Sequence, residues 1–101
     1  TLTAISLVEY VIFAPVFEEL AFRGLLFAIL RRKFRFLPAA LISASIFAIA
    51  HGYGLVGFIS VLWSGVLWAW MYQKTGSLLP GILAHAINNL LVCLAVMALL
   101  R

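Results

Sequence analysis

Three acid–base side chains stand close together in a stretch that is otherwise apolar. The segment VFEELAFRG, residues 16–24, places Glu18, Glu19 and Arg23 between hydrophobic residues. Residues four apart share a face of a helix, whereas adjacent residues point about 100° apart. Glu19 and Arg23 are therefore predicted to form an ion pair, which leaves Glu18 on another face without a partner in its own helix. We interpret Glu18 as the carboxylate that takes part in acid–base chemistry. The ion pair between Glu19 and Arg23 is interpreted as structural.

Two histidines and an asparagine are the other polar groups that favour chemistry. The segment HAINN, residues 85–89, puts His85 and Asn89 on one helix face, with Asn88 rotated off it toward a helix–helix contact. His51 ends a separate apolar stretch, FAIAH. An ionisable group in hydrocarbon costs about 2.5–3.5 kcal/mol on insertion scales, so such groups usually serve a function. A hydrogen bond to a neighbouring carbonyl would be enough to explain a buried His51. It would not explain two histidines, an unpaired glutamate and an asparagine on three separate helices.

The composition around these groups is that of a membrane protein. Of the 101 residues, 66% are hydrophobic and 10% are charged, with a mean hydropathy of +1.20. Soluble domains carry about 45–50% apolar and about 25% charged residues. Two stretches, 36–73 and 75–100, contain no Asp, Glu, Lys or Arg. A membrane-crossing helix needs about 20 mostly apolar residues, so the first stretch can hold two crossings and the second one.

The chain is therefore predicted to be an all-α, polytopic transmembrane helix bundle with about four spanning helices. The first helix is expected to be interrupted or bent near Pro15, because proline lacks the backbone N–H that continues a helix. A polar turn, KTGS, offers Gly76 as a helix C-cap. The chain forms a single domain, 1–101, and the absence of an initial Met suggests an excerpt of a longer protein. The predicted helices are 2–31, 37–50, 55–73 and 78–100.

Basic residues next to the apolar segments predict the orientation in the membrane. The cluster RRKFR, residues 31–35, follows the first helix, and Lys74 follows two crossings later, on the same side. The positive-inside rule places that side in the cytoplasm. The formal charge of +4 is explained in this way, and nucleic acid is not expected as a partner. The expected partners are the lipid bilayer and a peptide or lipidated protein, and the expected location is a bacterial cytoplasmic membrane.

Three motifs in this order resemble one protease family. EELAFR fits EExxxR, FAIAH fits FxxxH and HAINN fits HxxxN. Together they resemble the CPBP family of CAAX proteases and bacteriocin-processing enzymes, which are intramembrane glutamic proteases of the type II CAAX prenyl endopeptidase kind. The resemblance extends over about residues 12–94. It implies an intramembrane endopeptidase whose catalytic residues are Glu18, His51, His85 and Asn89, supported by Glu19 and Arg23.

The chemistry implied by this resemblance is hydrolysis of an amide bond by an activated water. A glutamate in a low-dielectric site has a raised proton affinity, which suits a general base. Glu18 and His51 would activate the water, and His85 with Asn89 would donate hydrogen bonds to the oxyanion of the tetrahedral intermediate. No metal cofactor is expected. The substrate remains open between the C-terminus of a prenylated protein and other membrane-associated peptides.

Other mechanisms are weaker on sequence grounds. Glu18, His51 and His85 would suffice as three zinc ligands, but the chain has no HExxH motif. Ser64 lacks the glycine that a GxSG nucleophile motif requires, and Cys93 lies about 12 Å beyond His85 along the helix, so both are assigned to packing. The tryptophan-rich segment 62–72 is assigned to the lipid-facing surface and an interfacial aromatic belt.

Two functions without hydrolysis also remain open. A membrane scaffold or bacteriocin-immunity protein would bind a partner without using the full set of Glu, His and Asn side chains. A carrier with a proton relay is less compatible with the sequence, because the chain shows no inverted repeat.

Overall fold

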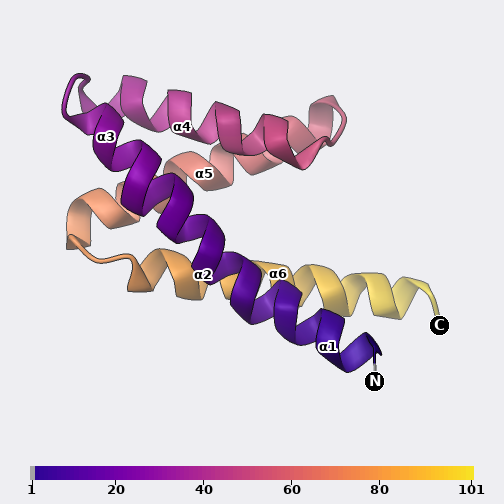
Figure 1. Ribbon diagram of the computed structural model, residues 1–101. Helices are drawn as coiled ribbons and strands as arrows, with labels where there is room; N and C mark the ends of the chain where they lie inside the picture. The colour runs from indigo at the N-terminus through magenta and orange to yellow at the C-terminus, as the bar shows by residue number, and fades with distance from the viewer. Residues whose placement is uncertain (1) are drawn as a thin grey trace.

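The computed structural model describes residues 2–101, with side chains from residue 3 onward, and over this range it contains helices and no strands. The first helix runs from residue 2 to residue 31, and three further helices follow it (Figure 1). The predicted all-α fold is confirmed. The first helix comprises α1 (Leu2–Val8), η1 (Glu9–Phe13), α2 (Ala14–Glu19), η2 (Leu20–Phe27) and α3 (Ala28–Arg31); the others are α4 (Phe36–His51), α5 (Leu55–Thr75) and α6 (Leu79–Leu99).

The first helix continues as one rod through Pro15, but its α-helical hydrogen bonding is interrupted just before the proline, where an interruption or bend was predicted. The five residues before Ala14 form η1, a π-helical segment in which the Ala14 N–H donates to the carbonyl of Glu9, five residues earlier. This wider turn accommodates a position that has no N–H to donate. A second π-helical segment, η2, begins directly after Glu19. The helix therefore absorbs the proline by a change of hydrogen-bond register.

The helices fold back on each other at two glycine turns. Gly52 ends α4 and Gly76 ends α5, each with a φ of 68°. This left-handed conformation strains residues with a Cβ, so glycine is favoured at both positions. The Gly76 N–H donates to the carbonyl of Tyr72 at 2.8 Å, which confirms the predicted C-cap.

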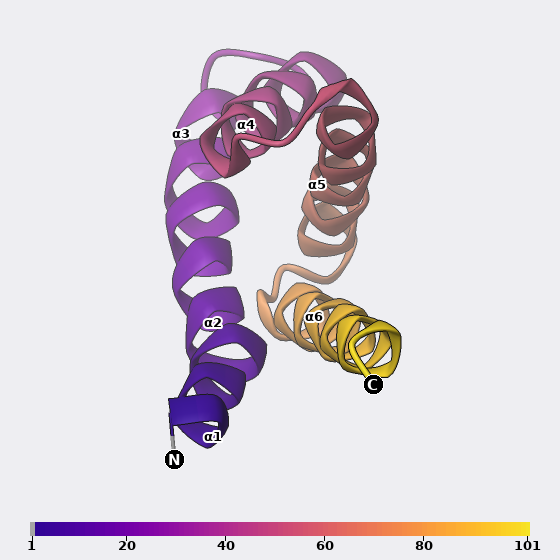
Figure 2. The ribbon, with the colours of Figure 1, turned by 90° about the vertical axis from the view of Figure 1, so that its right-hand side faces the viewer.

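The long first helix crosses the face made by the other three. In Figure 2 it stands on one side, α5 and α6 lie opposite, and α4 bridges them at the top. Alanines at the α4–α5 contact allow close approach of the two backbones. The buried cluster at this end consists of Phe27, Ala39, Ala40 and Ala69.

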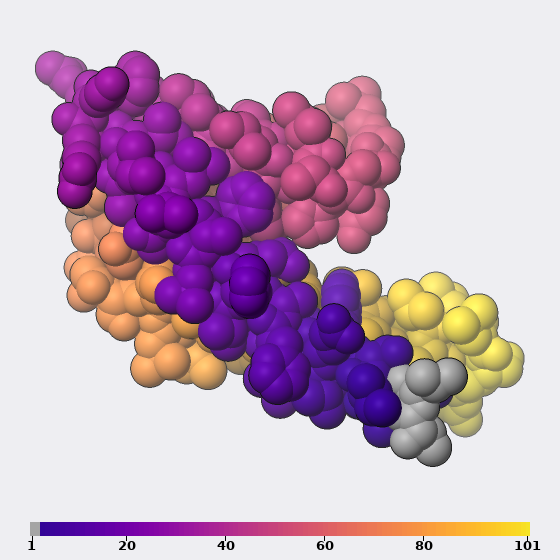
Figure 3. All heavy atoms as spheres, viewed as in Figure 1, coloured from indigo at the N-terminus to yellow at the C-terminus, as the bar shows by residue number. Residues whose placement is uncertain are grey.

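The opposite end of the bundle is open. The turn between α4 and α5 diverges from the ends of α1 and α6, and the space-filling view is hollowed between them (Figure 3). The outer surface carries many exposed large apolar side chains. Two helices, α5 and α6, have the length and hydropathy to cross a membrane, with mean values of 1.6 and 2.1, whereas α4 is shorter. The number of crossings, predicted as about four, remains a prediction.

The two basic segments lie at the same end of the bundle. The Arg31 side chain donates from Nε to Gln73 Oε1 at 3.0 Å, and so joins the end of α3 to the end of α5 beside Lys74. This contact agrees with the expectation that both basic turns face the same side of the membrane. Their cytoplasmic orientation remains a prediction.

Gly65 is predicted to be essential for the close packing of α4, α5 and the first helix. A Cβ at this position would stand 2.9 Å from the Ala44 Cβ and 2.9 Å from Arg23 Nη2. We expect Gly65→Ala to destabilise the fold by about 1–3 kcal/mol, as overpacking typically does. Thermal unfolding in detergent, followed by circular dichroism, measures this effect.

Gly54→Ser is the matched control. A Cβ at Gly54 would meet nothing within 4 Å, and serine is a favoured helix N-cap. Equal unfolding midpoints for the two variants would contradict the packing role of Gly65.

Candidate active site

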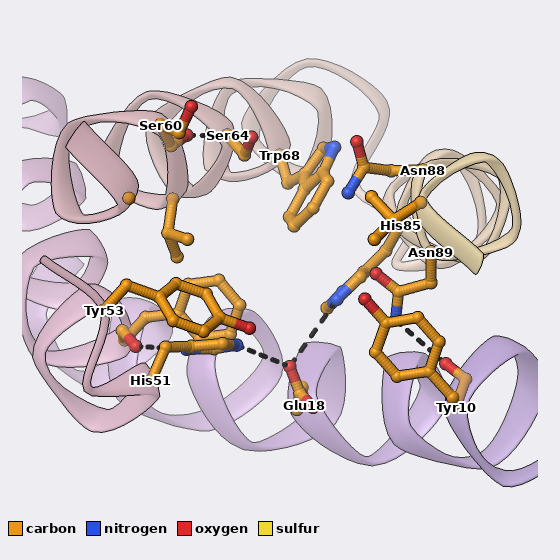
Figure 4. Close-up of a pocket in the computed structure, with 14 residues that line it drawn as sticks. Tyr10, Glu18, His51, Tyr53, Ser60, Ser64, Trp68, His85, Asn88 and Asn89 are labelled. Atoms are coloured by element: carbon orange, nitrogen blue, oxygen red, sulfur yellow. Dashed lines mark hydrogen bonds and ion pairs between the residues drawn. The ribbon is translucent and has the colours of Figure 1, made fainter. Parts of the chain in front are cut away.

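The four predicted catalytic residues come together around one cavity of about 340 Å³. Glu18 reaches it from α2, His51 from the end of α4, and His85 and Asn89 from α6 (Figure 4). Helix α5 forms the facing wall. Residues from distant parts of the chain therefore meet where the sequence motifs predicted a shared site.

Glu18 lies between the two imidazoles. Its Oε1 is 3.7 Å from His51 Nε2 and 3.5 Å from His85 Nε2. In Figure 4 the dashed lines from His51 and from His85 converge on this carboxylate. The Glu18 Oε1 atom is buried and, within the part of the chain described, accepts no hydrogen bond. Buried polar atoms normally have a partner, so this oxygen is available to a group that enters the cavity.

The Nδ1 atom of each imidazole forms a hydrogen bond with another group of the protein. His51 donates from Nδ1 to the Phe47 carbonyl at 2.7 Å, and His85 donates from Nδ1 to Glu19 Oε2 at 2.9 Å. A carbonyl or an ionised carboxylate only accepts, so Nδ1 carries the hydrogen in both rings. Each Nε2 is thereby directed toward Glu18, and the neutral imidazole presents a lone pair there.

The predicted ion pair between Glu19 and Arg23 is confirmed. Arg23 Nη1 lies 3.4 Å from Glu19 Oε2, and both side chains are 1% exposed. The same carboxylate oxygen accepts the hydrogen bond from His85. The guanidinium lies 4.4 Å from the Phe47 ring centre and 5.5 Å from that of Trp68, within the range of a cation–π interaction. The pair thus supports a histidine of the candidate site.

Trp68 is a residue of the cavity that the sequence analysis missed. It was assigned with its segment to the lipid-facing surface, but it is 6% exposed and stacks on His85 with ring centres 4.3 Å apart. Trp63 and Trp70 of the same segment are exposed, and their contact with lipid remains a prediction. The available signal was spacing, because Ser60, Ser64 and Trp68 recur every four residues and so share one face of α5.

Two neighbouring assignments also need correction. Asn88 was predicted to contact another helix, but its side chain is exposed and lines the cavity. Ser64, assigned to packing, lines it too, while its hydroxyl donates to the Ser60 carbonyl at 3.1 Å. The angular position of a residue on its helix does not show whether its side chain contacts another helix or lines a cavity, because that depends on where the neighbouring helices lie.

Asn89 makes a contact that links α6 to the first helix. Its Nδ2 donates to the carbonyl of Tyr10 at 2.9 Å.

Cys93 is a free thiol of intermediate exposure. Within the described residues, no three His, Cys, Asp or Glu side chains are arranged to hold a metal ion.

Comparisons with known proteins agree with the motifs. The family model for Type II CAAX prenyl endopeptidase Rce1-like proteins matches residues 1–91. A Bacillus subtilis (strain 168) protein described as "Putative membrane peptidase YdiL" is 35% identical over 81 residues, which is 80% of this chain and 33% of that protein. The chain thus spans about a third of that relative's length. No solved structure matches. Together with the two helices of membrane-crossing length, these matches show that the chain is a membrane protein and belongs to the Type II CAAX prenyl endopeptidase Rce1-like family.

Proposed function

We propose that the chain supplies the catalytic helices of an intramembrane endopeptidase, in which Glu18 and His51 activate the attacking water. The observation that carries this proposal is the buried Glu18 Oε1, which faces His51 Nε2 and His85 Nε2 at 3.7 and 3.5 Å. These separations exceed a direct hydrogen bond and suit groups that share a bridging water.

In the proposed reaction the water lies between Glu18 and His51. Its proton passes to one of these two bases while its oxygen attacks the carbonyl carbon of the scissile amide. The hydrogen bond from His51 to the Phe47 carbonyl fixes the ring so that Nε2 is the basic atom. Collapse of the tetrahedral intermediate then breaks the C–N bond, and the proton taken from water is delivered to the leaving amine.

His85 and Asn89 are proposed to stabilise the oxyanion. The bond from His85 Nδ1 to the Glu19 carboxylate orients the ring with Nε2 toward the cavity, where this nitrogen would donate to the oxyanion when the ring carries both hydrogens. The amide of Asn89 retains a second N–H besides the one bound to Tyr10. Preorganised donors of this kind are usually worth about 10²–10³ in rate each.

The proposed substrate is a peptide segment of a membrane-associated protein. The family name refers to prenylated C-terminal substrates and the bacterial relative is described as a membrane peptidase, so cleavage near a lipidated or membrane-bound C-terminus is the starting hypothesis. We further propose a multi-pass protein of a bacterial cytoplasmic membrane. The cavity lies between helices, with polar side chains from the first helix, α4, α5 and α6, as expected for hydrolysis within a bilayer.

Glu18→Gln is predicted to abolish cleavage without unfolding the protein. Removal of a general base typically lowers the rate about 10²–10⁴-fold, and the amide is nearly isosteric with the carboxylate. The measurement is turnover of a fluorogenic peptide library by the purified protein, with Glu9→Gln as the control. Glu9 lies on the same helix, outside the cavity. Unchanged cleavage by Glu18→Gln would refute the assignment.

Glu19→Gln is predicted to act on stability more strongly than Glu18→Gln does. It would leave the buried Arg23 charge without its carboxylate, a loss that typically costs about 3–5 kcal/mol. The unfolding midpoint of Glu19→Gln should therefore fall well below those of the wild type and of Glu18→Gln. Similar midpoints for the two glutamine variants would show that the ion pair does not support the fold.

Cleavage is predicted to be independent of a bound metal ion. Incubation with 1,10-phenanthroline or EDTA, followed by removal of the chelator, should leave peptide turnover unchanged. Loss of activity that zinc restores would instead favour the alternative in which Glu18, His51 and His85 bind zinc.

Trp68 is predicted to position His85 through ring stacking. Trp68→Leu should lower kcat about tenfold or more, because His85 loses the surface that fixes its ring. Trp68→Phe keeps an aromatic face and should recover most of the loss. Trp63→Leu, at an exposed position on the same helix, is the control. Equal activity of Trp68→Leu and Trp68→Phe would contradict this role.

A further inference from the structure

Pro15 is buried in the first helix, three residues before Glu18, and it has no backbone N–H to donate to a carbonyl of the preceding turn. The Ala14 N–H donates to the carbonyl of Glu9 in the π-helical register. In that register the carbonyl of Tyr10 would pair with the N–H of residue 15. Proline has none, so the helix supplies no donor from that position to Tyr10.

The Tyr10 carbonyl is instead bound by a side chain from another helix. Asn89 Nδ2 donates to it at 2.9 Å across the contact between η1 and α6. Asn89 is 7% exposed and lies one helical turn after His85, on the same face. Two buried groups, a backbone acceptor and an amide donor, are thus paired between helices that are far apart in sequence.

This contact fixes the orientation of the Asn89 amide. A carbonyl oxygen only accepts, so Nδ2 and not Oδ1 must face Tyr10. A rotation of the Asn89 amide that swaps Nδ2 and Oδ1 would break this buried hydrogen bond. The second N–H of Nδ2 and the acceptor Oδ1 keep defined directions beside the cavity.

We propose that Pro15 is a positioning residue for Asn89, because it withholds the N–H that would otherwise bind the Tyr10 carbonyl within the first helix. Restoring an N–H at position 15 would return that carbonyl to the helical hydrogen-bond ladder and draw it along the helix axis, away from α6. Asn89 would then lose its fixed orientation. The contact itself is independent of the reaction, whereas its importance for turnover rests on the proposed function.

The first test measures the hydrogen bond directly. Asn88 and Asn89 are the two asparagines in this sequence, so asparagine labelled with ¹⁵N in the side-chain amide gives two ¹⁵N signals by NMR in detergent, each coupled to a pair of hydrogens. We expect the Asn89 amide hydrogen that is bound to the Tyr10 carbonyl to exchange with D₂O at least about tenfold more slowly than the amide hydrogens of exposed Asn88. In Pro15→Ala this difference should largely disappear.

The control for this test is Pro38→Ala. Pro38 is an exposed proline in the first turn of α4, and its replacement should leave the exchange of Asn89 unchanged. Equal exchange of the two asparagines in the unaltered protein would overturn the inference without any variant. Retained protection of Asn89 in a folded Pro15→Ala protein would overturn it as well.

The second test is a double-mutant cycle on peptide turnover. Asn89→Ala removes the donor, and Pro15→Ala should lower kcat about 10- to 100-fold with little change in KM, because a misplaced oxyanion donor affects the transition state. If Pro15 acts through Asn89, the double variant should be no slower than Asn89→Ala alone. A rate reduced by the product of the two single effects would show that Pro15 acts elsewhere.

The two proposals fail in different ways. Unchanged turnover in Glu18→Gln would defeat the proposed hydrolysis but would not alter the exchange of the Asn89 amide. Protection of Asn89 that is lost in Pro15→Ala, with turnover unchanged, would confirm the contact and refute its role in positioning for catalysis.

Discussion

The buried ion pair between Glu19 and Arg23 joins all parts of the bundle. Its cation lies against aromatic rings of α4 and α5, and its anion accepts a hydrogen bond from α6. In the described part of the chain the guanidinium makes no hydrogen bond of good geometry, so its charge is compensated by the carboxylate and by the π faces. A buried charge without such compensation costs several kcal/mol, and the four helices are therefore constrained to meet here.

Glu18 and Glu19 are adjacent in sequence but have opposite environments. Glu19 is 1% exposed and fully engaged, whereas Glu18 is 30% exposed and faces the cavity. This difference follows from the 100° step between neighbouring helical residues. One carboxylate thereby holds His85 by Nδ1 while the other meets it at Nε2, so a single histidine connects the supporting pair with the proposed base.

Glycine and proline serve the site indirectly. Gly65 leaves room for Arg23, and Gly81 leaves room for Glu19, whose Oε1 would lie 3.3 Å from a Cβ there. Pro15 changes the register of the first helix and leaves the Tyr10 carbonyl for Asn89. These residues add no functional group of their own, yet they determine how closely the functional groups approach.

The sequence by itself determined what depends on local helical geometry. The four helical segments, the ion pair four residues apart, the separation of Glu18 from it and the C-cap at Gly76 all follow from the backbone of one helix or turn. The tertiary structure alone decided the stacking of Trp68 on His85, the exposure of Asn88 and the partner of Asn89. Each depends on which helices lie opposite, and one-dimensional spacing carries no information about that, because the neighbouring face comes from residues dozens of positions away.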